Sequence, residues 1–125
     1  MPGTKKVNLS TNSSKKYRII CTENFISEAK KLAKKYPHIK EDFLLLRDDL
    51  KIDPVTGNDF LGDDLYKVRM QITDKNKGQS GGARLIINVK IIEKMVYVIS
   101  VYDKSKIENL LDNALDKLLK NAGLK

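Results

Sequence analysis

The sequence is poor in the residues that most often build disulfide frameworks, metal sites and catalytic centres. Its 125 residues include one cysteine, one histidine and no tryptophan. The lone Cys21 excludes an internal disulfide framework and a cysteine-based zinc site. His38 follows Pro37 between two expected helices, and we interpret it as structural or exposed. A catalytic centre built on histidine is therefore not expected.

Long apolar runs are also absent. No stretch approaches the roughly 18 apolar residues of a membrane span, and the polar N-terminus, MPGTKKVNLSTNSSKK, has no apolar segment typical of a signal peptide. Without export signals or paired cysteines, the cytoplasm is the expected compartment. The length fits one domain with one hydrophobic core.

Charge is abundant but unevenly distributed. The formal net charge is +8, and residues 1–16 carry four lysines and no acid, so we expect a disordered basic tail there. Residues 41–66 hold eight acids against Arg47 and Lys51, whereas residues 67–90 hold six basic residues against one acid. This polarity favours a basic surface for an anion, with nucleic acid the leading candidate. A charged surface that is merely solvated is the alternative.

The first half of the chain reads as one strand followed by two helices. The run YRIIC at residues 17–21 is β-prone. Two amphipathic helices follow, meeting at Pro37 and ending before Pro54, so we expect an antiparallel helical hairpin. The segment 53–64 is predicted to be a turn-rich acidic loop.

The second half alternates as strands do and ends in a helix. The predicted strands lie at residues 65–72, 83–92 and 96–102. A capping box formed by Ser105 and Glu108 is expected to start the last helix, and Gly123 to end it. The order β-α-α-β-β-β-α predicts a single α+β domain at residues 17–125, with a small, mostly antiparallel sheet packed against the helices.

Side chains alternate across a sheet, so residues of one parity share a face. One face is expected to be apolar and covered by helices, and on the last strand it includes Tyr97, Ile99 and Val101. The other face is expected to gather Lys67, Arg69, Arg84, Asn88, Ser100 and Tyr102. Cations can hold phosphates while a tyrosine stacks on a base, so we interpret this face as a platform for RNA. A polar face that water simply wets is the alternative.

Glycine and positive charge are concentrated at residues 75–89, KNKGQSGGARLIINV. A nucleotide-binding P-loop is excluded here, because its glycines lead into a helix and a Lys-Ser/Thr pair closes it. In this sequence the glycines lead into a strand.

Four features together resemble the RelE/ParE superfamily of bacterial toxins, and more narrowly its RelE/HigB-type members. They are the element order, the Lys67-x-Arg69 strand, the KGQSGGARLI entry to the next strand and the VISVYDKS ending. The resemblance covers about residues 17–122. It implies the toxin of a type II toxin–antitoxin system, which cleaves messenger RNA, often on the ribosome, and is held inactive by a cognate antitoxin protein.

No cofactor, metal or membrane partner is expected. Other members of the same fold inhibit DNA gyrase, so a non-enzymatic gyrase inhibitor stays open as an alternative, as does a plain RNA-binding domain.

The resemblance also implies roles for single residues. Metal-free RNA cleavage needs a base for the 2′-hydroxyl, cations for the phosphorane charge and an acid for the 5′-oxygen. Lys67 is expected to be the base or its partner, and Arg69 and Arg84 to hold phosphate. Tyr102 or Lys104 is expected near the leaving group, although a lysine is a weaker analogue of the arginine that a relative has there.

The same resemblance gives the glycine-rich stretch a function, because relatives have a mobile loop there. Its glycines are expected to let the backbone approach a bulky polyanion, with Lys75 and Lys77 adding charge at the rim. The full predicted RNA-binding set is Lys75, Lys77, Gly81, Gly82, Asn88 and Lys90. A flexible hairpin connection is the alternative. Asp103 is expected either to orient Lys104 or to depress activity, and the stacking tyrosine of RelE is matched by Leu110.

Overall fold

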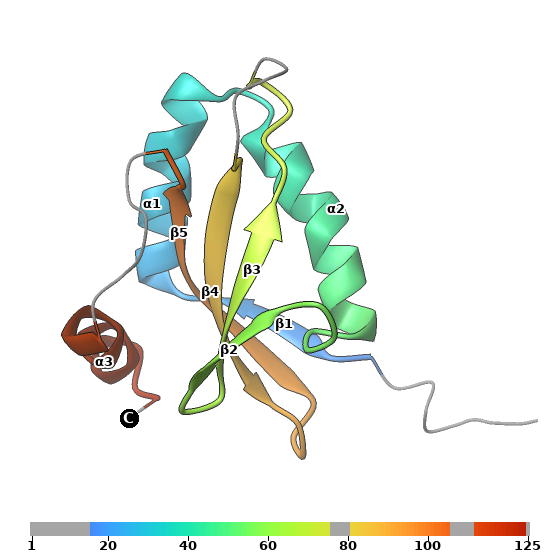
Figure 1. Ribbon diagram of the computed structural model, residues 1–125, viewed down its shortest axis with the longest axis vertical. Coiled ribbons are helices and arrows are strands. Elements are labelled where there is room, and N and C mark those ends of the chain that lie inside the picture. Colours follow the sequence, from blue (N-terminus) through green and yellow to red (C-terminus); the bar gives the residue numbers. More distant parts are fainter. Residues whose placement is uncertain (1–15, 76–80, 106–111, 125) are drawn as a thin grey trace, which may run out of the picture.

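The computed structural model describes residues 16–75, 81–105 and 112–124, which form a five-stranded sheet with three helices (Figure 1). In chain order the elements are β1 (Arg18–Cys21), α1 (Glu23–Lys35), α2 (Ile39–Ile52), β2 (Asp59–Gly62), β3 (Leu65–Met70), β4 (Ala83–Lys90), β5 (Met95–Asp103) and α3 (Asp112–Asn121). Except for Lys16, the predicted tail lies outside the described residues, and the domain boundary at residue 17 stays a prediction. None of the described helices has the length and apolar character that a membrane span requires.

The strands are arranged in the order β1-β5-β4-β3-β2, with β1 parallel to β5 and the other pairs antiparallel. The α+β class and the mostly antiparallel sheet are therefore confirmed. Each helix and strand predicted from the periodicity of apolar residues has a counterpart in this sheet or on its faces.

Strand β2 was not expected, because it lies in the segment predicted to be an acidic loop. It pairs with β3 through a two-residue turn at Asp63 and Asp64, whose φ angles are 51° and 63°. Positive φ at both positions matches a type I′ hairpin turn, which usually carries Asn-Gly or Asp-Gly. The Asp-Asp pair lacks that signature, and this is why the hairpin could not be recognised in the sequence.

Helices α1 and α2 run antiparallel and pack on one face of the sheet, as the predicted helical hairpin requires (Figure 1). Thr22 caps α1 by accepting a hydrogen bond from the N–H of Phe25. The rings of Phe25 and Phe43 join the two helices, with centroids 4.9 Å apart. Residues of both helices and the inward side chains of the strands form the main core.

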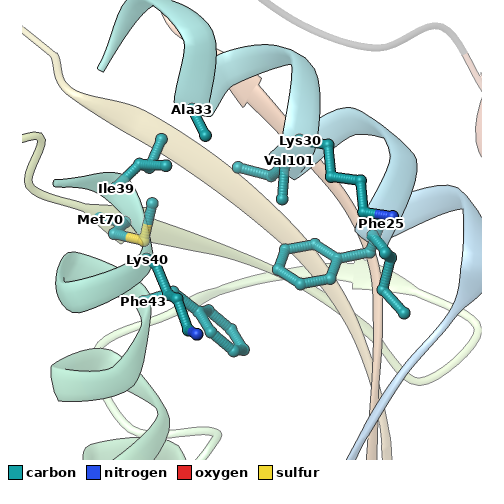
Figure 2. A pocket seen from close by; sticks show the side chains of 10 residues that line it. Phe25, Lys30, Ala33, Ile39, Lys40, Phe43, Met70 and Val101 are labelled. Carbon is teal, nitrogen blue, oxygen red and sulfur yellow. The ribbon is translucent and has the colours of Figure 1, made fainter. Parts of the chain in front are cut away.

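A hollow of about 420 Å³ opens between α1 and α2 (Figure 2). Phe25 and Phe43 lie at its sides, and Met70 and Val101 belong to the sheet beneath it. Among the described residues that line it, the charged ones are Lys30 and Lys40, and no carboxylate, hydroxyl or imidazole is present. The hollow therefore offers no pair of groups for acid–base chemistry.

The predicted faces of β5 are wrong along part of the strand, because a bulge interrupts the alternation. Ile87 is opposite Val98 while its predecessor is opposite Ser100, which leaves Ile99 as an extra residue. Val96 and Val98 consequently belong to the main core under α1 and α2, whereas Ile99 packs on the opposite face. The Ser100 hydroxyl donates to Glu28 of α1 at 2.7 Å and does not join the cationic residues.

Helix α3 covers part of the second face, which is therefore not a fully open platform. The cluster beneath it comprises Leu65, Ile86, Ile99, Tyr102 and Leu119, with Tyr97, Leu115, Leu118 and Leu124 around them. Gly123 ends the helix as predicted: its φ is 74°, and the N–H of Leu124 donates to the carbonyl of Leu119 at 2.9 Å. Glu108 of the predicted capping box and Leu110 lie outside the described residues.

Candidate functional site

Three of the predicted catalytic residues form a single row across the sheet. Arg69 of β3 is opposite Arg84 of β4, and Arg84 is opposite Tyr102 of β5. Directly opposed residues of antiparallel strands have Cβ atoms about 5 Å apart and share a face. The structure thus places two guanidinium groups and a phenol side by side.

The other two predicted catalytic residues lie beside this row. Lys67 is two residues from Arg69 on the same face of β3, about 7 Å along the strand. Lys104 directly follows β5, and its N–H donates to the carbonyl of Gly82 at 3.1 Å. Its side chain packs against Gly81, where an added Cβ would lie 2.7 Å from Lys104 Cδ.

Arg84 is held in place by the backbone that precedes it. Its side chain is 7 % exposed, and Nη1 donates to the carbonyl oxygens of Gly81 and of Ala83, the latter at 3.0 Å. Both of these bonds use one nitrogen of a group that carries five N–H donors. The guanidinium is thus oriented by the chain and still has donors with which to bind a phosphate.

Tyr102 combines burial with an unsatisfied hydroxyl. Its side chain is 5 % exposed, yet among the described residues the hydroxyl has no hydrogen-bond partner. Burial raises the pKa of Tyr102, and the neighbouring Arg84 lowers it by less. The phenol is therefore protonated at neutral pH, and its O–H is available as a hydrogen-bond donor. A buried polar group without a partner is unfavourable, and a bound ligand would satisfy it.

Lys75 does not contribute charge at a rim, which corrects the sequence prediction. Its Nζ donates to Asp103 Oδ1 at 2.7 Å and to the carbonyl of Gly82 at 3.3 Å, and the side chain is 5 % exposed. The ammonium is thus neutralised inside the protein. Lys77, the second predicted rim cation, lies outside the described residues.

Asp103, which the sequence links only to Lys104, is the acceptor of a buried network. Burial alone would raise the pKa of Asp103, but hydrogen bonds from Lys75, Tyr36 and Ser105 outweigh burial and hold that pKa well below its usual range. Tyr36 donates its hydroxyl at 2.7 Å. Since Tyr36 and Asp103 are 67 residues apart in sequence, no local pattern indicates that they meet.

Asn88 and Lys90 lie away from the row, and their predicted part in RNA binding stays a prediction. They are four and six residues beyond Arg84 on β4, roughly 13 and 20 Å along the strand. Asn88 is 1 % exposed and donates to the carbonyl of Asp63 at 3.2 Å. Lys90 pairs with Asp64 at 3.0 Å. Parity placed them on the same face, but distance removes them from the site.

The backbone of the turn before β4 requires glycine at positions 81 and 82. Gly82 has a φ of 52°, and an added Cβ would collide with the carbonyl oxygen of Met70. Gly81 has a φ of 99° and lies against the Lys104 side chain. Their absent side chains allow the turn to lie against β3 and Lys104, and the predicted approach to a polyanion stays a prediction.

His38 lies at the surface, in agreement with its interpretation as structural or exposed. The ring nitrogen Nδ1 lies 2.7 Å from Asp74 Oδ1, and the backbone N–H of His38 donates to Asp74 Oδ2. The hydrogen bond and the charge of Asp74 raise the pKa of His38. Next to this pair, Thr73 donates its N–H to Asp42 of α2 at 2.9 Å. The segment before Lys75 is therefore attached to the start of α2.

Among the described residues, no group of three or more His, Cys, Asp or Glu side chains is arranged to hold a metal ion.

Solved structures show the same fold. A double mutant of the Escherichia coli toxin RelE in the free state matches with a TM-score of 0.53 and 21 % identity, covering 85 % of this chain and 97 % of that one. The archaeal RelE–RelB complex from Pyrococcus horikoshii OT3 matches with a TM-score of 0.50 and 20 % identity, covering 73 % and 98 %. No curated protein matches the sequence. The fold is thus that of RelE-type toxins.

The family model described as the RelE toxin of the RelE/RelB toxin–antitoxin system matches residues 51–124. The matched segment is more than half of the chain and contains β2 to β5, α3 and the whole candidate row. The protein therefore belongs to the RelE toxin family, and the predicted identity as the toxin of a type II toxin–antitoxin system is confirmed.

Proposed function

We propose that this toxin is a metal-independent endoribonuclease that cleaves messenger RNA at the row formed by Arg69, Arg84 and Tyr102. The observation that carries the proposal is the buried Tyr102 hydroxyl, which has no partner among the described residues and lies beside an arginine. An RNA phosphate beside the guanidinium groups would place an oxygen within reach of that hydroxyl. Family membership supports the same reaction class, since ribonuclease activity is the known role of RelE.

The reaction divides between the residues according to their protonation. The 2′-hydroxyl attacks the adjacent phosphorus, its proton goes to a base, and the P–O5′ bond breaks as the leaving oxygen takes a proton. Arg69 and Arg84 stabilise the negative charge that develops on the phosphorane. Tyr102 is protonated at neutral pH and its hydroxyl lies beside Arg84 without a partner among the described residues, so it is assigned as the acid, with Lys104 competing for that role. Lys67 is left as the base or as its partner.

The substrate and partners follow from this assignment. Messenger RNA is the proposed substrate, on the ribosome or free, and comparing cleavage of naked RNA with cleavage in a translating extract distinguishes these. The cognate antitoxin is proposed to place an acidic or amphipathic segment on the exposed Arg69 and beside the half-buried Lys67. The cytoplasm, where transcripts and antitoxin meet, is the proposed compartment.

Expression of the wild-type and Arg84→Ala toxins in bacteria tests the function. The wild-type protein should arrest growth and truncate transcripts, and the substitution should relieve both effects. Arrest with intact transcripts and reduced gyrase activity would instead establish the inhibitor that other members of this fold represent.

A further inference from the structure

One carboxylate joins three segments of the chain around the candidate site. Asp103 Oδ1 accepts hydrogen bonds from Lys75 Nζ at 2.7 Å, from the N–H of Ser105 at 3.0 Å and from the Ser105 hydroxyl at 2.8 Å. Its other oxygen, Oδ2, accepts from the Tyr36 hydroxyl at 2.7 Å. Asp103 itself is 3 % exposed.

The two oxygens serve different parts of the molecule. The Oδ2 bond leads to Tyr36 at the end of α1, which belongs to the scaffold. The Oδ1 bonds lead to Lys75, which lies in the connection between β3 and β4, and to Ser105, which follows Lys104. Only the Oδ1 side therefore connects to residues proposed to touch RNA.

Hydrogen bonds to the backbone of the turn before β4 link Lys75 and Lys104 to Arg84. Lys75 Nζ and the N–H of Lys104 both donate to the carbonyl of Gly82, at 3.3 and 3.1 Å. The carbonyl of the preceding Gly81 accepts a hydrogen bond from Arg84. The aliphatic part of the Lys104 side chain packs against Gly81, where a Cβ would otherwise lie. A displacement of Lys75 or Lys104 would consequently move the turn that orients Arg84.

We propose that Asp103 is a positioning residue for RNA cleavage: through Lys75 and Ser105 it holds the Gly81–Gly82 turn and Lys104 in register with Arg84 and Tyr102. The inference rests on the proposed function and assigns Lys75 to the support of the site instead of to its RNA-binding surface. Asp103 lies at the end of β5, where its backbone is paired with Ala83 of β4. Asp103 is therefore well placed to fix the segment that enters β4, residues 81–82, and the segment that leaves β5, residues 104–105.

The test compares Asp103→Asn, the double variant Asp103→Asn/Lys75→Met and the control Tyr36→Phe in the full-length protein. Single-turnover cleavage of a short RNA, RNA affinity and amide hydrogen exchange are measured for each. Asp103→Asn should slow cleavage about 10-fold to 100-fold with a much smaller change in RNA affinity, because misplacement by about 1 Å has such an effect on rate. The Lys104 amide should exchange faster, while that of Ile87 in β4 stays protected.

The double variant separates positioning from charge balance. Asp103→Asn leaves the buried Lys75 ammonium without a counter-charge, and Lys75→Met removes the positive charge as well. Thermal stability should therefore recover in the double variant while cleavage stays slow. Recovery of cleavage together with stability would overturn the proposal, because the carboxylate would then serve only to neutralise Lys75.

Tyr36→Phe removes the bond on the scaffold side and leaves both Oδ1 connections. It should keep the Lys104 amide protected and cleave RNA close to the wild-type rate. Losses as large as those of Asp103→Asn, or a Lys104 amide that stays protected in Asp103→Asn, would contradict the assignment. If the wild-type toxin cleaves neither the short RNA nor transcripts in a translating extract, the proposed function fails, and the exchange measurements still decide whether Asp103 holds the turn and Lys104.

Discussion

Arg69 and Arg84 are direct partners in the register of β3 and β4, but Arg69 is exposed while Arg84 is 7 % exposed. In the part of the chain that the structure describes, neither forms a salt bridge. Like charges on opposed residues of a sheet are destabilising. A phosphate between the two guanidinium groups would relieve that repulsion, and this makes the pair suited to bind a polyanion.

Arg69→Ala should weaken RNA binding about equally for all sequences, because binding to a phosphate carries no base information. The plot of log affinity against log salt concentration should become shallower by roughly 0.7, as expected when the protein neutralises one phosphate fewer on a single strand. Lys90→Ala is the matched control, since it removes a cation at the far end of β4. Affinity titrations at several salt concentrations give both slopes. An equal effect of the two substitutions would mean that RNA binds along the whole strand.

Tyr102→Phe should lower RNA affinity by no more than the single hydrogen bond that the hydroxyl would donate, because the ring keeps its packing beneath α3. If the hydroxyl is the general acid, single-turnover cleavage should fall by ~10²–10⁴. Lys104→Ala shows which of the two groups protonates the leaving oxygen. If neither substitution slows cleavage by more than a few fold, the acid lies elsewhere.

The hydroxyl groups of the buried residues Tyr36 and Tyr102 should differ in their contribution to stability. Tyr36→Phe removes a hydrogen bond to a charged carboxylate and should lower the free energy of unfolding by about 1.5–3 kcal/mol. Tyr102→Phe removes a hydroxyl with no partner among the described residues, so that free energy should stay the same or rise slightly. Urea denaturation of both variants measures the difference. A destabilised Tyr102→Phe protein would show that this hydroxyl has a partner in the free toxin.

His38 should titrate above its ordinary pKa of 6.5, because Asp74 stabilises its protonated form. A raised folded-state pKa adds stability that is fully present below the unfolded pKa and is lost as pH rises through the folded one. Asp74→Asn should return the pKa of His38 towards 6.5 and remove this pH dependence. Because the sequence has a single histidine, its proton NMR signal reports the titration directly. An unchanged pKa in Asp74→Asn would contradict the ion pair.

Gly82→Ala should lower the free energy of unfolding by more than about 1 kcal/mol, since alanine is strained at this φ and its Cβ collides with Met70. Gly57→Ala is the control, because Gly57 has a φ of 84° but nothing within 4 Å of an added Cβ. The control should therefore show the backbone strain without the collision. Equal losses in urea denaturation would indicate that the turn can move away from β3.

Elements whose causes are local could be predicted from the sequence. The spacing of apolar residues predicted both helices of the hairpin, and Gly123 predicted the end of α3 through its freedom to adopt positive φ. Alternation also placed Arg69, Arg84 and Tyr102 on one face, because parity survives along β3, β4 and the part of β5 after the bulge.

Features that depend on residues far apart in the chain could be recognised only in the folded structure. The bulge at Ile99 exchanged the faces of the preceding residues of β5, because alternation reverses wherever one strand contains an extra residue. The sequence alone does not distinguish Lys75 from Lys67. In the structure, Lys75 is buried because it forms an ion pair with Asp103, a carboxylate 28 positions away. Charge and parity indicate which residues can share a surface. Pairing register and long-range hydrogen bonds decide which of them reach it.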